Sequence, residues 1–346
     1  MISEKRDIRA LSKEELRSFF VGIGDKAFRG NQVYEWLWSK GIHSFEGMTN
    51  ISKETRASLE ENFVINHIKV DHLQKSNDGT IKNAVKLFDG LIVESVLIPT
   101  KSRTTACVSS QVGCSLDCHF CATARLKRMR NLNPDEIYDQ VVAIHRESVL
   151  YHDRPLSNIV FMGMGEPLMN YKNVLLSIDK ITSDEGLGMS PKRITVSTSG
   201  VPKMIRKMAD DEVKFNLAVS LHSAIQETRE QIMPFAKNFT LEDLRSSLEY
   251  WYDKTNKIIT YEYIVWEGIN DKEEDIKALV KFCKYTPCKV NIIEYNPIDD
   301  VEFQQADSAA IDLYIAHLEK NKIPVTVRRS RGKDIDAACG QLANKQ

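Results

Sequence analysis

Three cysteines in the stretch Cys114-Ser-Leu-Asp-Cys118-His-Phe-Cys121 have the spacing CxxxCxxC, with an aromatic residue directly before the third. Three thiolates this close together can bind three irons of a four-iron, four-sulfur cluster, which leaves the fourth iron open to another ligand. An open position is typical of a metal centre that binds and activates something, whereas an electron carrier would have its fourth cysteine. The spacing therefore predicts a cluster with a ligand site.

Two other interpretations of these thiols remain open. A structural zinc site would need a fourth ligand, and His119 is a candidate, although we expect it to point away from the site that its neighbour Cys118 faces. Plain buried thiols would explain the residue type but not the spacing. A zinc-stabilised RNA-binding protein is therefore the alternative from another functional class.

Two further cysteines lie beside basic runs. Cys107 falls in an expected strand, and Cys339 falls in a polar loop near the end of the chain, whereas Cys283 and Cys288 have the pattern of packing residues. One basic run, residues 125–130, directly follows the cluster cysteines, and another, residues 328–333, directly precedes Cys339. Because each run adjoins a candidate reactive cysteine, the pair favours a phosphate-rich substrate at the site.

The composition is that of an ordinary globular protein. The chain has 346 residues, of which 42% are hydrophobic, a formal net charge of −1 and seven cysteines. An odd number of cysteines, three of them crowded together, favours reduced thiols and a metal site over a disulfide framework. No apolar run approaches the ~20 residues of a membrane span, and the first residues lack an apolar signal core. We therefore expect a cytoplasmic protein that makes no membrane contact and binds nucleic acid only through local basic patches.

The elements that must position these residues fall into three parts. Residues 1–64 have helical patterns, with capping-box spacing between Ser12 and Glu15. Residues 65–100 alternate in short runs with turn signals at residues 77–79 and 89–90, which predicts a small antiparallel β connector. Residues 101–342 repeat strand and helix patterns, which predicts a parallel α/β architecture, either barrel-like or doubly wound.

The repeated units can be located by residue range. The expected strands are 104–109, 158–162, 193–197, 215–221, 258–265, 290–295 and 324–327, and the expected helices are 134–147, 171–184, 201–210, 241–251, 271–284 and 308–320. In either architecture the site should lie at the carboxyl ends of the strands.

Polar residues follow four of these strands. They are Gly163-Met-Gly165-Glu166-Pro167, Ser197-Thr-Ser199-Gly200, Ser220-Leu221-His222 and Asn296-Pro297. Glycines let backbone groups approach a ligand closely, and Glu166 could accept hydrogen bonds from an ammonium group. Each motif alone could be a tight turn or a helix cap. Four of them on one rim favour a ligand site.

These motifs together resemble the radical S-adenosylmethionine (radical SAM) superfamily, whose signature is CxxxCxxC with an aromatic before the third cysteine, here Phe120. Within it, the stretches 107–114, 161–167 and 334–342 resemble the dual-specificity family that methylates C2 of adenine in 23S rRNA and tRNA. The similarity runs from about Phe28 to Leu342. It implies a partial (β/α)6 radical-SAM barrel with a small N-terminal helical domain, which contributes RNA affinity, and a short β connector.

The resemblance implies a mechanism with two molecules of S-adenosylmethionine per turnover and one [4Fe-4S] cluster on Cys114, Cys118 and Cys121. The first molecule methylates Cys339 by displacement, and the second yields a 5′-deoxyadenosyl radical that takes a hydrogen from that methyl group. The carbon radical adds to C2 of adenine and forms a protein–RNA adduct. The family pattern makes Glu94 the base that removes the C2 proton and Cys107 the residue that releases the adduct by forming a disulfide with Cys339.

Cofactor contacts and partners are also implied by the resemblance. The contacts are Gly165, Glu166, Ser197, Ser220, Leu221, His222 and Asn296, with Ser199 as the alternative to Ser197. The partners would be 23S rRNA, the anticodon loop of tRNA and a flavodoxin-type reductant, and the enzyme would be a monomer. The nearest rival is the sister activity that methylates the same rRNA nucleotide at C8; the sequences around Glu166 and Ser197 favour C2.

Overall fold

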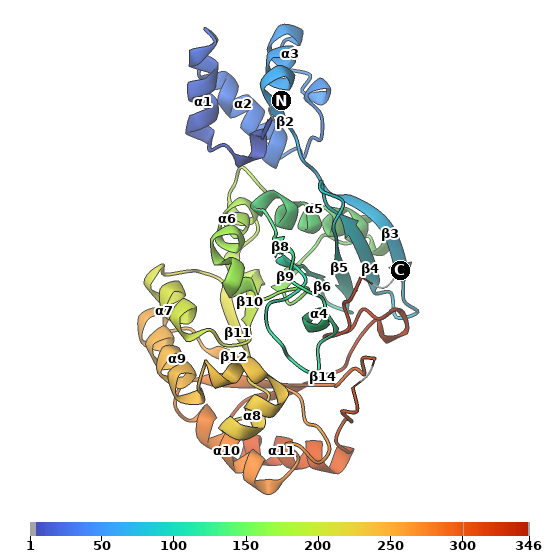
Figure 1. Ribbon diagram of the computed structural model, residues 1–346, viewed down its shortest axis with the longest axis vertical. Coiled ribbons are helices and arrows are strands. Elements are labelled where there is room, and N and C mark those ends of the chain that lie inside the picture. The colour runs from blue at the N-terminus through green and yellow to red at the C-terminus, as the bar shows by residue number, and fades with distance from the viewer. Residues whose placement is uncertain (1–4, 300, 345–346) are drawn as a thin grey trace.

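The computed structural model describes residues 5–299 and 301–344, which form a small helical unit above a larger α/β unit (Figure 1). The helical unit contains α1 (Lys13–Gly22), α2 (Phe28–Trp38) and α3 (Lys53–Asn62), closed by the short parallel pair β1 (Arg6–Asp7) and β2 (Phe63–Val64). The predicted capping box is present, because Ser12 and Glu15 exchange side-chain to backbone hydrogen bonds at the start of α1.

One ten-stranded sheet runs through the larger unit, in the order β14-β13-β12-β11-β10-β9-β6-β5-β4-β3. Its parallel strands are β6 (Thr104–Cys107), β9 (Asn158–Phe161), β10 (Ile194–Thr198), β11 (Asn216–Ser220), β12 (Ile259–Tyr263), β13 (Cys288–Ile293) and β14 (Val325–Arg328). All seven coincide with expected strands. Between β14 and β3, the described residues make no pairing that closes the sheet, so the barrel is partial.

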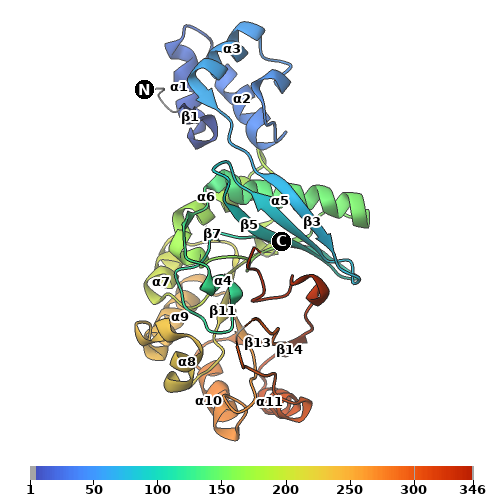
Figure 2. The ribbon, with the colours of Figure 1, turned by 45° about the vertical axis from the view of Figure 1, so that its right-hand side comes forward.

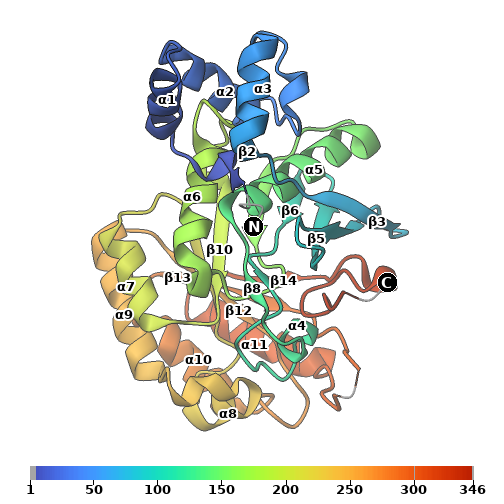
Figure 3. The same ribbon diagram turned by 45° about the horizontal axis from the view of Figure 1, so that its top comes forward.

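Helices follow the parallel strands and cover the outside of the sheet (Figure 3). They are α5 (Pro134–His152), α6 (Tyr171–Thr182), α7 (Pro202–Asp210), α8 (Gln226–Ile232), α9 (Leu241–Thr255), α10 (Glu273–Cys283) and α11 (Ser308–Lys320). Most residues of β6, β10, β11 and β12 are buried, as expected when both faces of a parallel sheet are covered, whereas β14 at the sheet edge has no buried residue. The sequence pattern missed α8, which is too short to show a helical period.

The predicted β connector forms three antiparallel strands, β3 (Lys69–Lys75), β4 (Ile81–Lys86) and β5 (Ile92–Pro99), with both turns where the sequence signalled them. Because β5 pairs antiparallel with β6, these strands extend the main sheet. Helix α5 covers one face of them, where Asn83 donates a hydrogen bond to Glu147. The C-terminal segment lies on the other face (Figure 2).

A buried ion pair joins the helical unit to α5. Arg9 donates two hydrogen bonds of 2.7 Å to Asp139, and its guanidinium lies over the Trp38 ring. Tyr138 on α5 donates a hydrogen bond to the Trp38 carbonyl. In residues 5–299 and 301–344, no helix is long and apolar enough to cross a membrane.

Candidate active site

The cluster motif lies on the loop that follows β6. Between the short antiparallel strands β7 (Gln111–Val112) and β8 (Arg130–Asn131), the chain carries the three cysteines and then the single turn α4 (Ala122–Arg125). Gly113 has a φ of +72°, and a Cβ there would lie 2.5 Å from the Lys127 carbonyl oxygen. Only glycine therefore allows the loop to close on itself at this point.

Cys114, Cys118 and Cys121 line one cavity. Burial is the main cause that raises the pKa of the Cys118 thiol, and the neighbouring thiols of Cys121 and Cys114 raise it further. Among the described residues, no three His, Cys, Asp or Glu side chains converge on a single metal ion. A cluster does not require such convergence, because each thiolate binds a different iron. His119 does not line this cavity; it lines a neighbouring one.

The glycine-rich turn after β9 forms the opposite wall of the same cavity. Gly165 has a φ of +93°, and a Cβ there would lie 2.5 Å from the side chain of Gln111, so only glycine fits beside Gln111 at this turn. Glu166 is buried, and its carboxylate accepts hydrogen bonds from the backbone of Leu168 at 3.0 Å and of Ser199 at 2.8 Å. Burial raises the pKa of Glu166 although both hydrogen bonds oppose it. No ion pair within the described chain involves Glu166.

The ends of β10 and β11 complete the rim. Ser197, Ser199, Ser220 and His222 line the cavity, whereas the fully buried side chain of Leu221 does not, so only the backbone of Leu221 could contact a ligand there. His222 has a φ of +56°, which is uncommon outside glycine and marks a constrained position.

The ring of His222 is neutral. Its Nδ1 accepts a hydrogen bond of 3.2 Å from the Ile264 backbone, and burial lowers its pKa to about 3. The ring packs edge-on against Phe120, with centroids 4.7 Å apart. The aromatic residue of the cysteine motif thus connects the cluster loop to the strand ends.

Cys339, on the loop that follows β14, lines the same cavity, and Figure 3 shows this loop beside α4. The Gly340 carbonyl accepts a hydrogen bond of 2.7 Å from Ala122, and the Leu342 carbonyl accepts one of 2.6 Å from Thr123, both in α4. Asn296 is buried and donates to the Cys339 carbonyl at 3.1 Å, while its Oδ1 atom has no partner. In this arrangement Asn296 holds the loop, and its free acceptor remains available.

Cys339 lies between two cavities that share part of their walls. One cavity contains the cluster cysteines, and the other contains Cys107, at the end of β6. Cys339 is exposed because it faces both cavities, although the protein around them still raises the pKa of its thiol. Burial raises the pKa of Cys107 to about 12, with a further contribution from Cys339. Arg328, which pairs with Glu262, lines both cavities and opposes both shifts.

Glu94 lies outside both cavities. It is buried in β5, where one oxygen lies 3.2 Å from the Lys82 ammonium group. Its other oxygen accepts hydrogen bonds from the backbone amides of Ala343 at 2.8 Å and Asn344 at 3.1 Å. The C-terminal segment therefore covers the residue that the family pattern makes the base.

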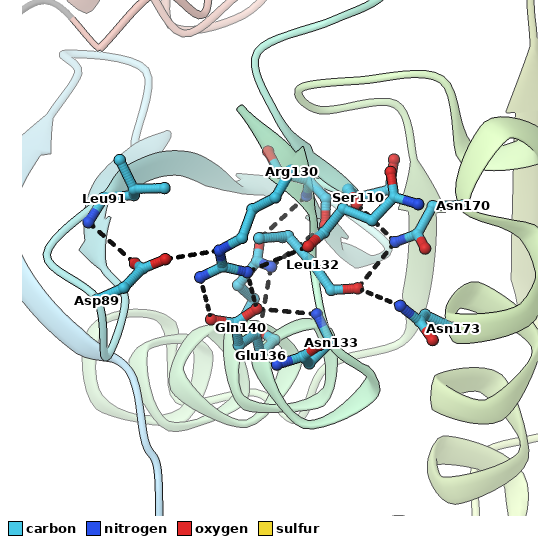
Figure 4. A network of polar contacts seen from close by, with 12 residues as sticks. Asp89, Leu91, Ser110, Arg130, Leu132, Asn133, Glu136, Gln140, Asn170 and Asn173 are labelled. Carbon is cyan, nitrogen blue, oxygen red and sulfur yellow. Dashed lines mark hydrogen bonds and ion pairs between the residues drawn. The ribbon is translucent and has the colours of Figure 1, made fainter. Parts of the chain in front are cut away.

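Arg130, in the first basic run, is part of an internal network (Figure 4). It pairs with Asp89 at 2.6 Å and makes a two-pronged ion pair with Glu136, at 2.7 and 2.8 Å. These contacts hold β8 between the β4–β5 turn and the start of α5. Arg130 is therefore not free to contact phosphate, contrary to the expectation for this basic run. Lys127 and Arg128 are exposed and could do so.

The second basic run is also largely paired. Its ion pairs are Arg328 with Glu262, Arg329 and Lys333 with Glu294, and Arg331 with Asp78. Most of these cations still reach solvent, and Arg329 is 81% exposed in its side chain. These cations could also bind phosphate only if breaking their ion pairs costs little free energy, as is usual for exposed pairs.

Arg229 is a buried residue beside the site that no sequence motif indicated. Its guanidinium is fully buried beside the cluster loop and donates to the carbonyls of Ser199 at 2.6 Å and Leu221 at 3.3 Å. Burial lowers its pKa to about 10, while the nearby Cys118 thiol opposes this shift. Arg229 lies in α8, a helix that the sequence pattern did not predict, so no local signal marked Arg229 as a site residue.

Comparisons with known proteins agree with this geometry. Residues 6–65 match the model of the "Ribosomal RNA large subunit methyltransferase N-terminal domain", and residues 108–282 match that of the "Radical SAM superfamily". A Flavobacterium johnsoniae protein described as "Probable dual-specificity RNA methyltransferase RlmN" is 75% identical over 99% of this chain and 98% of its own. One from Cytophaga hutchinsonii with the same description is 54% identical over 99% and 94%. The crystal structure of a radical SAM methyltransferase from Sphaerobacter thermophilus matches with a TM-score of 0.92 and 33% identity, over 98% of this chain and all of that one.

Proposed function

We propose, because this chain belongs to the RlmN family of radical SAM RNA methyltransferases, that it methylates C2 of an adenosine in 23S rRNA and in the anticodon loop of tRNA. The chain is an S-adenosylmethionine-dependent enzyme, and its family uses one [4Fe-4S] cluster. The position of the methylated carbon and the identity of the two RNAs come from the sequence motifs and are proposals.

The residues around the first cavity fit these cofactors. Three thiols share a cavity, Gly165 contributes backbone to its wall, and Glu166 has no cationic partner in the described chain. In this proposal Cys114, Cys118 and Cys121 hold the cluster. The residues proposed to contact S-adenosylmethionine are Gly165, Glu166, Ser197, Ser220, Leu221, His222 and Asn296. When bound, the cluster supplies the electron that cleaves S-adenosylmethionine.

The position of Cys339 between the two cavities is the observation that carries the proposal. The Cys339 sulfur takes a methyl group by displacement and, after that group has lost a hydrogen atom, carries its carbon to C2 of adenine. Glu94 removes the C2 proton, and the adduct gives up one electron, which would return to the cluster. The Cys107 thiolate then bonds to the Cys339 sulfur while the sulfur–carbon bond breaks; its electron pair goes to the carbon, which takes up a proton and remains on C2 as the new methyl group. A residue that both accepts a methyl group and is resolved by a second thiol must reach both partners.

Nucleoside analysis tests the position of methylation. The reconstituted enzyme would be incubated with 23S rRNA and with tRNA, and the digested RNA would be separated by liquid chromatography and identified by mass spectrometry. We expect 2-methyladenosine from both RNAs. Detection of 8-methyladenosine alone would instead identify the sister activity.

Anaerobic purification tests the proposed metal and partners. We expect a brown protein that contains iron and sulfide and cleaves S-adenosylmethionine when reduced; a colourless protein with one zinc would be the zinc-stabilised RNA-binding protein. We also propose a flavodoxin-type reductant and a monomeric enzyme that meets its RNA in the cytoplasm. These assignments rest on the family resemblance.

A further inference from the structure

Lys82 is a buried lysine that the proposed mechanism does not use. It lies in β4 with 3% of its surface exposed. In the β4–β5 pairing, Lys82 is opposite Val96 and Ala84 is opposite Glu94, so Lys82 and Glu94 are diagonal neighbours on one face. Their charged atoms are 3.2 Å apart, and the two side chains are 4% and 1% exposed. Lysine is rarely buried in this way without a charged partner.

The same pair holds the end of the chain. Glu94 accepts hydrogen bonds from the amides of Ala343 and Asn344, and the Asn344 side chain donates to the Ile92 carbonyl at 2.8 Å, also in β5. Lys82 reaches the Asp336 carbonyl at 3.5 Å, on the other side of Cys339. The ion pair therefore contacts the C-terminal loop on both sides of the methyl-carrying cysteine.

A second anchor lies farther back along this loop. Asp334 accepts hydrogen bonds from the Ser76 hydroxyl at 2.5 Å and the Asn77 amide at 3.1 Å, in the turn between β3 and β4. The segment from Asp334 to Asn344 is thus fastened at both ends to the antiparallel strands. At its C-terminal end, the fastening is the carboxylate that the mechanism needs as a base.

We propose that Lys82 is the positioning residue of Glu94, orienting its carboxylate so that it binds the amides of Ala343 and Asn344 and takes the C2 proton once they withdraw. The inference rests on the proposed role of Glu94. In the proton transfer the C2–H bond breaks, its electron pair stays in the purine ring and the proton goes to a Glu94 oxygen. Lys82 touches neither RNA nor cofactor; it acts through Glu94.

The first test is Lys82→Met in the full-length, cluster-reconstituted enzyme, with Lys86→Met as the matched control. Lys86 is exposed on the same strand and makes no ion pair in the described chain. Mass spectrometry would measure methyl loading of Cys339, and denaturing gels would measure the adduct with a 23S rRNA fragment. We expect normal loading in both variants. In Lys82→Met alone, turnover should fall about tenfold or more and the adduct should accumulate, because a charged hydrogen bond is lost from the base. Normal turnover and no accumulated adduct would overturn the inference.

A double variant separates action through Glu94 from a general structural role. Adding Lys82→Met to Glu94→Gln should reduce turnover less than about twofold further, because the partner of Lys82 is already neutral. A further tenfold loss would overturn the inference. This comparison also applies if Lys82→Met alone does not fold, since the double variant leaves no unpaired buried charge.

Hydrogen exchange supplies a readout that is independent of activity. In Lys82→Met the peptide that covers residues 341–344 should exchange about tenfold faster, and unchanged exchange would count against the inference. The two proposals fail differently. If Glu94→Gln turns over normally, the proposed base is wrong; if Glu94→Gln stalls while Lys82→Met does not, only the positioning role is wrong.

Discussion

Two buried glutamates serve the two sides of the Cys339 loop, and the protein holds them in different ways. On the cofactor side, at the ends of β9 to β11, Glu166 accepts hydrogen bonds from two backbone amides and has no cationic partner among the described residues. On the carrier side, formed by β4 to β6 and the C-terminal loop, Glu94 has a lysine as well as two amides. Both carboxylates are almost inaccessible to solvent.

Under the proposed function, the difference follows from the role that each carboxylate would have. A buried carboxylate without a cation is costly, and it suits a site whose ligand brings a positive ammonium group. A carboxylate that must stay charged while covered by its own chain needs a cation from the protein. The cofactor side is thus built to be completed by a ligand, and the carrier side is complete in itself.

The largest expected effect separates the two cysteines of the carrier side. Cys339→Ala should abolish both methyl loading and turnover, because it removes the sulfur proposed to carry the methyl group, and Cys121, which also lines both cavities, is a proposed cluster ligand. Cys107→Ala should load the methyl group normally and then stall as a protein–RNA adduct. Intact-mass measurement and denaturing gels distinguish these outcomes, and an active Cys107→Ala enzyme free of adduct would refute the resolving role.

A smaller effect is expected on the cofactor side. Glu166→Gln removes the charge that would meet an ammonium group, so S-adenosylmethionine should bind about 10- to 100-fold more weakly. Calorimetric titration of the reconstituted enzyme measures this, with the exposed Glu267→Gln as control. Methyl loading and RNA methylation should fall together in Glu166→Gln, whereas Glu94→Gln should spare the loading. Equal loss of loading in both would erase the distinction between the two sides.

A change at Arg130 tests the ion-pair network that holds β8 beside the start of α5. Its side chain is 24% exposed, but that of Glu136 is only 2% exposed, so Arg130→Met leaves a buried carboxylate without its cation. We expect the free energy of unfolding to fall by about 2–3 kcal/mol, measured by urea denaturation. Arg128 is exposed on the same loop, directly before β8, so the free energy of unfolding of Arg128→Met should stay within about 0.5 kcal/mol of the wild type. Equal stability of the two variants would contradict the structural role of the network.

The smallest effect concerns RNA affinity. Arg128→Ala should weaken RNA binding a few-fold and lower the slope of log affinity against log salt by about one, because one phosphate contact is lost. Filter binding across a salt series measures the slope. Lys289→Ala is the control, since Lys289 is exposed at the opposite ends of the strands. An unchanged slope would show that the loop between α4 and β8 does not contact the RNA.

Most helices and strands, and the cofactor chemistry, could be predicted from the sequence. Short β-rich runs between helical patterns located the seven parallel strands, because the residue types of buried strands and amphipathic helices reflect which of their faces are buried. The cysteine spacing identified the cluster because its ligands are adjacent in the chain. Confirmation by the family comparisons covers the fold, the cofactors and the reaction class.

Pairings between distant segments could not be predicted in the same way. Nothing local indicates that β5 continues the main sheet through β6, or that Glu94 binds the amides of Ala343 and Asn344. The predicted turn at residues 89–90 located the hairpin but not its register, because Leu87 pairs with Leu91 and the connection spans residues 88–90. A two-residue turn would have shifted the register by one and placed Lys82 and Glu94 on opposite faces.

The double fastening of the Cys339 loop has a kinetic consequence. Because Asp334 is fixed to the β3–β4 turn and the carbonyls of Gly340 and Leu342 are bound by α4, the loop has few conformations in which its thiol is far from Cys107, even after Ala343 leaves Glu94. The two sulfurs therefore react at a high effective concentration, set by the fold and not by the thiols in solution. Small external thiols should compete poorly for the adduct, yet they are still needed afterwards to reduce the disulfide and return the loop to its starting state.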